Sequence, residues 1–143
     1  MSEIRHLTAA DYDAVLALWQ RADLPSIRPE GRDSREAFAR QLSRGQIVLG
    51  LENADELIGC VVVTHDTRKG WINRLAIDPI HRRKGYGLQL IRAAEDAFRN
   101  LGLVVHAALI EDWNDVSLAL FQKAGYSIHR DVLYVSRRDS ESA

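Results

Sequence analysis

In the first third of the 143-residue chain, apolar residues are first spaced as in a strand and then as in helices. Residues 3–7 alternate and predict a strand, after which Thr8 is expected to cap a helix. Apolar side chains at i, i+3, i+4 and i+7 across 12–19 predict that helix. A second helix is expected over 34–44, with Ser34 as its N-cap.

Three strongly apolar runs follow, and each predicts a strand: 46–51, 57–64 and 71–77. Only short turns join these strands, so neighbours in the sequence must be antiparallel. Helical spacing of apolar residues from 91 to 101 predicts a long helix that ends at Gly102. The strand expected at 104–110 must then run parallel to 71–77, because a helix crosses between them.

The last part of the chain predicts a helix over 115–124, followed by a bent strand or hairpin formed by 126–130 and 132–135. The polar tail, 137–143, is expected to be frayed. This order of elements predicts an α/β fold in a single domain, 1–143. In its mixed sheet a mostly antiparallel half meets a parallel pair.

Composition and charge exclude several classes of protein. With 46% hydrophobic and 27% charged residues, the chain is typical of a globular domain. Its formal charge of −1 gives no general attraction to nucleic acid or membranes. No apolar run reaches the roughly 18 residues of a membrane span, and the N-terminus has no signal-peptide core. We therefore expect a cytoplasmic protein whose partners include neither nucleic acid nor a membrane.

The single cysteine, Cys60, rules out an intrachain disulfide, and no cysteine and histidine spacing matches a zinc site. No metal is therefore expected. Cys60 stands in an apolar run, so we expect a buried and unreactive thiol.

The segment between the strand at 71–77 and the following helix carries the chemistry. Cations at 82–84 and two glycines, Gly85 and Gly87, stand at the start of the helix. The first N–H groups of a helix lack intrahelical partners and lie at the positive end of its dipole, so they form an anion site. Glycines lack a Cβ, which lets a bulky diphosphate lie against the backbone.

Two well-known nucleotide-binding loops do not match this segment. A P-loop needs Lys and then Ser or Thr after its last glycine, whereas Lys84 precedes Gly85 and Leu88 follows Gly87. A dinucleotide fingerprint needs a third glycine or alanine at the position that Leu90 occupies. Both of these cofactor-binding modes are excluded.

A third pattern fits. The motif Arg82-x-x-Gly85-x-Gly87, with the preceding segment 75–79, resembles the Gln/Arg-x-x-Gly-x-Gly/Ala signature of the GNAT superfamily of acyl-CoA-dependent N-acyltransferases. The segment 114–126 is similar to the second signature of that family, which lies on the last helix. The predicted order of elements also matches a GNAT domain, so the resemblance covers nearly the whole chain. It implies a GNAT-like mixed sheet in which an antiparallel N-terminal half meets a splayed parallel pair, with helices on both faces.

The resemblance implies acetyl-CoA as co-substrate. In GNAT proteins the loop amides hold the pyrophosphate of coenzyme A, and the pantetheine arm pairs with the central strand. Carried over to this chain, the strand groups are those of Leu75 and Ile77. The side chain of Arg82 fixes the loop, and the loop groups are those of Arg83, Lys84, Gly85, Tyr86, Gly87 and Leu88.

Two residues of the last predicted helix also belong to the implied cofactor site. The amide of Asn114 either bonds the pantetheine arm or caps the helix, and chemistry alone supports both roles. Phe121 occupies the position where many members carry a tyrosine that protonates the leaving thiolate. A phenyl ring can only pack at that site, so water or another donor must serve, with Tyr86, Tyr126 and Tyr134 as candidates.

The catalytic groups depart from the family pattern. The resemblance assigns the backbone amide of Leu75 to the acyl oxygen. A general base is missing from its usual places, because Trp71 and Asn73 cannot accept a proton from an ammonium. Glu111, at the end of the strand expected at 104–110, is the first candidate, acting directly or through water. The next candidates are Asp66, His65 and Asp112.

Four residues are predicted to meet the acceptor. In GNAT proteins the segment between the first two helices forms one wall of the acceptor site. Arg28 and Arg32 in that segment either grip an acidic group of the acceptor or are simply solvated. Asn73 and Arg74 interrupt an apolar strand, so they either line the acceptor site or bind a neighbouring carboxylate.

These residues predict an N-acetyltransferase that moves an acetyl group from acetyl-CoA to a primary amine by direct transfer in a ternary complex. The amine belongs to a small molecule, a protein N-terminus or a lysine. The alternative is a non-catalytic acyl-CoA-binding sensor of the same fold, because the usual tyrosine and base are missing. The resemblance also implies a homodimer, since pairing through the last strands is common in this fold.

Overall fold

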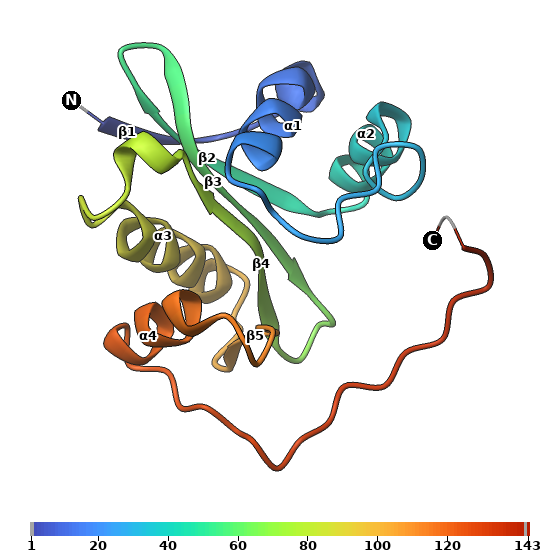
Figure 1. The fold of residues 1–143 in the computed structure, drawn as a ribbon, viewed down its shortest axis with the longest axis vertical. Helices are drawn as coiled ribbons and strands as arrows, with labels where there is room; N and C mark the ends of the chain where they lie inside the picture. The colour runs from blue at the N-terminus through green and yellow to red at the C-terminus, as the bar shows by residue number, and fades with distance from the viewer. Residues whose placement is uncertain (1, 142) are drawn as a thin grey trace.

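A five-stranded mixed sheet lies at the centre of the molecule, with helices on both of its faces (Figure 1). The computed structural model describes residues 2–141 and 143. The sheet order is β1-β2-β3-β4-β5; its first three pairings are antiparallel and β4–β5 is parallel. The strands are β1 (Ser2–His6), β2 (Ile47–Asn53), β3 (Glu56–His65), β4 (Gly70–Ile77) and β5 (His106–Ala108). The predicted fold class is confirmed.

The helices form one layer on each face of the sheet, in pairs that follow one another in the sequence (Figure 1). One face carries α1 (Tyr12–Arg21) and α2 (Arg35–Ser43), and the other carries α3 (Tyr86–Asn100) and α4 (Asp115–Lys123). Short 3-10 turns, η1 (Ala9–Asp11) and η2 (Pro79–His81), precede α1 and α3.

Strand β3 is buried on both faces because its alternate side chains enter two different cores. Val61 and Val63 pack into the core beneath α3, whereas Cys60 and Val62 pack into the core beneath α1. This explains why the sequence shows a continuous apolar run here rather than alternation. The predicted burial of Cys60 is confirmed, since it is fully buried.

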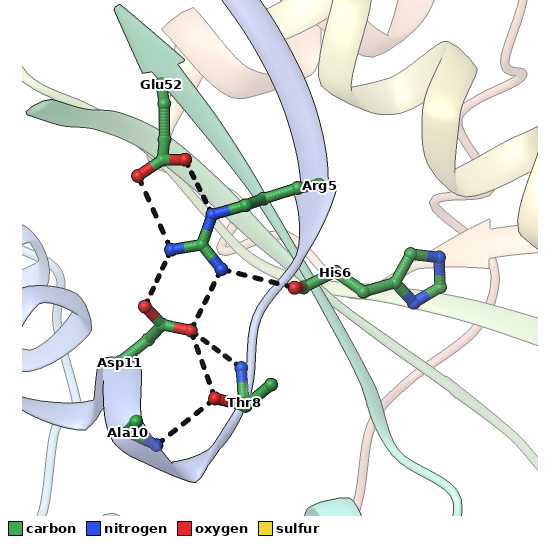
Figure 2. A network of polar contacts seen from close by, with 6 residues as sticks. All are labelled: Arg5, His6, Thr8, Ala10, Asp11 and Glu52. Atoms are coloured by element: carbon green, nitrogen blue, oxygen red, sulfur yellow. Dashed lines mark hydrogen bonds and ion pairs between the residues drawn. The ribbon is translucent and has the colours of Figure 1, made fainter. Parts of the chain in front are cut away.

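A polar network connects the end of β1 to the start of α1 and to β2 (Figure 2). The guanidinium of Arg5 contacts Asp11 at 2.7 Å and Glu52 at 2.6 Å. Asp11 also accepts the backbone N–H of Thr8 at 2.7 Å, and the Thr8 side chain accepts from Ala10. The predicted cap at Thr8 is confirmed; together with Asp11 it forms a capping box for η1, which leads directly into α1.

Two predicted strands differ from the structure. The strand expected at 104–110 is only three residues long, because β5 pairs with no residue of β4 beyond Ile72. The bent strand or hairpin expected at 126–135 is wrong: this segment forms no strand, and Val132 to Val135 are 71–88% exposed. Alternating residues form a strand only when a neighbouring edge accepts their backbone hydrogen bonds, and here the chain runs away from the sheet (Figure 1).

No helix within the described part of the chain has both the length and the apolar character needed to cross a membrane.

The Arg5–Asp11 pair generates a prediction about pH. The guanidinium of Arg5 holds the pKa of Asp11 below its ordinary value. A carboxyl with a lowered pKa stabilises the fold above its unfolded pKa of about 4, and the contribution is lost as the pH falls through the lower folded value. Asp11→Asn should therefore cost about 1 kcal/mol of unfolding free energy at pH 7, and less as the solution is acidified.

Urea unfolding at several pH values measures this difference. Asp96→Asn is the matched control, because Asp96 forms an exposed pair with Arg99 on α3 and should contribute less than about 0.5 kcal/mol. A cost at Asp11 that stays the same at every pH would contradict the assigned role of the charge.

Candidate active site at the β4–β5 gap

The two parallel strands separate halfway along β4. Gly70, Trp71 and Ile72 are in register with β5, whereas no described residue of β5 is opposite 73–77. On its other side β4 continues to pair with β3 as far as Ile77. One edge of β4 from 73 to 77 is therefore not covered by β5, and it includes the predicted positions Leu75 and Ile77.

A β-bulge lies at the point where the strands separate. Ala76 is opposite Cys60 and Asn73 is opposite Val62, so β4 holds one more residue than β3 in this interval. Arg74 has a φ of +48°, a left-handed conformation that is uncommon for a residue other than glycine. Backbone strain of this kind persists where the surroundings enforce it, and it concentrates at functional sites.

The loop that follows β4 presents free backbone amides at the start of α3. Gly85 is the N-cap residue with a left-handed φ of +81°, and no side chain caps the helix. The N–H groups of Tyr86, Gly87 and Leu88 have no hydrogen-bond acceptor among the described residues, since the first helical bond runs from Gln89 to Gly85. Unpaired amides at the positive end of a helix dipole are the groups that an anion would bind, so the predicted anion site has the backbone geometry that it needs.

The cations of this loop are exposed, and one of them is attached elsewhere. Arg82 donates to the carbonyl of Ala22 at 3.4 Å, which connects the loop to the end of α1. Lys84 lies 3.2 Å from the ring of His81, and Arg83 is exposed with a positive φ of +64°. The charges therefore surround the amides without capping them.

The two glycines of the motif have different surroundings. A Cβ at Gly85 would meet nothing within 4 Å, so the space beside the amides is open. A Cβ at Gly87 would lie 2.8 Å from the side chain of Leu120 on α4. The structure therefore shows a packing requirement at Gly87 that the sequence analysis did not recognise.

The two predicted site residues of the last helix, Asn114 and Phe121, have structural roles in capping and packing. Asn114 is the N-cap of α4, and its side-chain oxygen accepts from Ser117 at 3.2 Å, so the capping role is confirmed. Phe121 is buried, with its ring edge-on to Tyr126 at a centroid distance of 5.1 Å. No hydroxyl is present at position 121 to protonate a leaving group.

Of the three tyrosines suggested as proton donors, Tyr126 has its hydroxyl engaged in a hydrogen bond. Tyr126 donates its hydroxyl hydrogen to Glu95 at 2.7 Å, and Glu95 is paired with Arg92. Burial, and then the hydrogen bond to Glu95, raise the pKa of Tyr126 above its usual range. Tyr134 is 74% exposed on the C-terminal tail, and Tyr86 is the first residue of α3.

The first candidate base, Glu111, is exposed, and Asp66 is engaged in a turn. The strand ends at Ala108, so Glu111 is not at a strand end as predicted but on an exposed turn, where its carboxylate contacts no described residue. Asp66 accepts the backbone N–H groups of Lys69 and Arg68, which lower its pKa. These contacts give Asp66 a turn-forming role, and the assignment of Glu111 stays a prediction.

A polar cavity of about 230 Å³ lies on the α1–α2 side of the bulge. Three of the four predicted acceptor residues, Arg32, Asn73 and Arg74, line it. Arg28 does not, because its guanidinium donates to the carbonyl of Ile27. Sequence reasoning missed other lining residues, which come from five separate segments: Trp19, Asp33, Gln41, Gln46 and Thr64.

Asp33 holds the cationic wall of this cavity in place. The carboxylate is only 6% exposed, and its Oδ2 accepts from the backbone N–H of Arg28 at 2.8 Å and from Arg74 at 3.0 Å. The guanidinium of Arg74 also lies 5.1 Å from the Trp19 ring centroid. The alternative that Arg74 binds a neighbouring carboxylate is therefore confirmed, and Arg74 also lines the cavity, while its contact with an acceptor stays a prediction.

The single thiol, Cys60, is unreactive in its buried environment. Burial raises the pKa of the Cys60 thiol to about 12, so it carries no thiolate near neutral pH. No cluster of three or more metal-ligating side chains occurs in the residues that the structure describes.

Comparison with known proteins gives a consistent result. Residues 6–126 match the Acetyltransferase (GNAT) family. An acetyltransferase of Sodalis glossinidius (strain morsitans) is 27% identical over 137 residues, which cover 95% of this chain and 94% of that protein.

Two solved structures show the same fold. The PaiA N-acetyltransferase of Thermoplasma acidophilum, in complex with coenzyme A, has a TM-score of 0.80 at 20% identity over 90% of this chain and 91% of that one. An aminoglycoside acetyltransferase from an uncultured soil metagenomic sample, in complex with sisomicin, has a TM-score of 0.79 at 15% identity over 97% of each chain. With the family match across 6–126, the uncovered edge of β4 and the free amides at α3, the chain belongs to the GNAT family of acetyltransferases.

Proposed function

We propose that the protein is an acetyl-CoA-dependent N-acetyltransferase that transfers the acetyl group directly to a primary amine in a ternary complex. The observation that carries this proposal is the combination of two features that are close in the chain. The edge of β4 from 73 to 77 is not covered by β5, and the start of α3 has no side-chain cap. Coenzyme A has the matching parts, an amide-bearing arm and a diphosphate.

The binding mode follows from those parts. The amides of Tyr86, Gly87 and Leu88 take the diphosphate, with Arg83 and Lys84 supplying charge. The pantetheine arm pairs with the uncovered edge of β4 beside Leu75 and Ile77, in the way an added strand would. Asn114 and Phe121, at the start and in the last turn of α4, complete the opposite side of the site.

The chemistry requires little from the side chains. A neutral amine attacks the thioester carbonyl, the N–H of Leu75 stabilises the oxyanion, and the C–S bond breaks to release a thiolate. A thiolate with a solution pKa of about 8.5 leaves without much assistance at neutral pH, which fits Phe121 at the usual tyrosine position. The proton lost by the amine passes to water, with Glu111 as the carboxylate that we propose as its final acceptor.

A second candidate function is an acyl-CoA-binding sensor without catalysis. It is supported by the hydrogen bond that commits Tyr126 to Glu95 and by the absence of a contact that would hold Glu111 near the gap, as far as the described residues show. Both proposals require coenzyme A binding, and only the enzyme releases free thiol when an amine is added.

Substitution of Gly85 tests the diphosphate site. Gly85→Ala places a methyl group into the open space beside the amides and strains a left-handed φ, so the affinity for acetyl-CoA should fall about tenfold or more, or roughly 1.4 kcal/mol. Calorimetric titration with acetyl-CoA measures the change.

The matched control is Gly102→Ala at the other end of α3. Gly102 has nearly the same φ, +77°, and its Cβ would also meet nothing within 4 Å. Both variants should lose similar stability, roughly 1–2 kcal/mol, yet only the Gly85 variant should lose affinity. Equal affinities in the two variants would argue against the proposed diphosphate site.

Direct transfer predicts that the one thiol is dispensable. Cys60→Ala should retain kcat within about twofold of the unchanged protein, because no acyl-enzyme forms on a buried, protonated thiol. A stability loss of about 1 kcal/mol is expected from the lost sulfur contacts. The measurement is thiol release by the purified, folded variant. A variant that folds and yet has no turnover would indicate a covalent intermediate on Cys60.

An amine panel separates the enzyme from the sensor. Small amines, polyamines, amino acids and peptides with free N-termini are each incubated with acetyl-CoA and a thiol-detecting reagent. The enzyme should give amine-dependent thiol release with at least one class. Acetyl-CoA binding without release across the whole panel would favour the sensor instead.

A further inference from the structure

The cavity beside the β4 bulge has the chemistry to select the acceptor. It lies on the side of the sheet that carries α1 and α2, opposite α3 and its free amides. Asn73 and Arg74 both line it, and the next residue of the chain is Leu75, on the uncovered edge of β4. A molecule in this cavity is therefore next to the strand segment where the proposed function places the acyl group.

The charges in the cavity leave a net positive wall. Its lining holds two guanidiniums, those of Arg32 and Arg74, and one carboxylate, that of Asp33. Asp33 is buried and already accepts from Arg74 and from a backbone N–H, and Arg32 lies 4.0 Å away. Oδ2 of Asp33 is thus bonded within the protein, and the excess of one guanidinium over the single carboxylate of the lining disfavours a polycationic acceptor.

Both arginines keep donors that the protein does not use. Arg74 donates to Asp33 through Nη2, and its Nη1 and Nε donate to no described residue although the side chain is only 20% exposed. Arg32 donates through Nη2 to the carbonyl of Ser26. Burial, together with the charge of Arg32, lowers the pKa of Arg74, against the opposite effect of Asp33. An anion in this place would satisfy the free donors and relieve the repulsion between the cations.

An uncharged residue of the cavity lining, Asn73, offers a hydrogen-bond acceptor to an amine. Asn73 donates through its side-chain nitrogen to the Thr64 hydroxyl at 2.9 Å and to the carbonyl of Trp71 at 3.2 Å. These bonds fix the amide and leave its oxygen without a donor among the described residues. That oxygen is available to accept an N–H group of the incoming amine.

We infer that the acceptor is a small amine that carries a carboxylate, with the carboxylate held by Arg74 and Arg32 and the amine oriented by the side-chain oxygen of Asn73. The inference rests on the proposed transferase function and adds the substrate class. A volume of about 230 Å³ suits a molecule of amino-acid size. It is less than the about 300 Å³ at which sites for drug-sized ligands begin.

Matched pairs of amines test the selection. Each pair consists of an amino acid and its carboxamide, for example alanine and alaninamide, which share the amine but differ by the anionic charge. A polyamine serves as the cationic comparison. The kcat/KM from thiol release should favour the carboxylate member by roughly 10–100-fold, the effect of one or two charge-assisted hydrogen bonds.

Arg32→Gln is the main variant, because Arg32 is not bonded to a buried group and its removal leaves Asp33 paired with Arg74. It should raise KM for the amino acid about tenfold and leave the carboxamide unchanged. Arg74→Gln should have a larger effect, although it also unpairs the buried Asp33. Arg40→Gln on α2 removes one exposed charge outside the cavity, so it should leave both members of a pair unchanged.

The outcomes separate the inference from the proposed function. Thiol release with carboxamides or polyamines at least as fast as with amino acids would overturn the inference and support the transferase. Absence of thiol release with every amine would overturn the proposed transferase function. Calorimetric titration of the protein with amino acids would then test carboxylate binding in the cavity separately. Binding of amino acids that Arg32→Gln weakens would uphold the anion site, and absence of binding would refute it.

Discussion

The extra residue in β4 is the feature on which the candidate site depends. It bends the strand at Arg74, and the bend coincides with the place where β5 stops pairing. A straight strand would continue its ladder with β5 and leave no edge for a ligand. The left-handed φ at Arg74 costs free energy, and the contacts of its guanidinium with Asp33 and Trp19 help to hold that residue in place.

The bulge also explains why the two halves of the site lie on opposite faces of one sheet. Helix α3 begins soon after β4 and presents its free amides on one side, whereas the loop that ends at Asp33 approaches from the other. Residues 73–75 are the point where both sides are accessible. In the proposed function, binding of a nucleotide-linked thioester and selection of an amine would therefore use different side chains and meet at a shared strand.

The local features were predictable because each depends on a few neighbouring residues. The caps at Thr8, Ser34 and Asn114, the break at Gly102 and the loop at Gly85 all need only a particular residue type next to a helix end. The antiparallel order and the parallel crossover follow from turn length and an intervening helix. The strand prediction at 126–135 failed because alternation describes a surface and does not provide a partner edge.

The sequence by itself determined the element order, the uncapped glycine loop before α3 and the arginines and asparagine proposed to meet an acceptor, because these are properties of residue type and short spacing. Only the tertiary structure decided which of them converge. It brings Arg32, Asn73 and Arg74 to one cavity, excludes Arg28, and adds Asp33. It also commits Tyr126 to Glu95 and leaves Glu111 on an exposed turn. Such choices depend on contacts between residues tens of positions apart, and no short stretch of sequence carries that information.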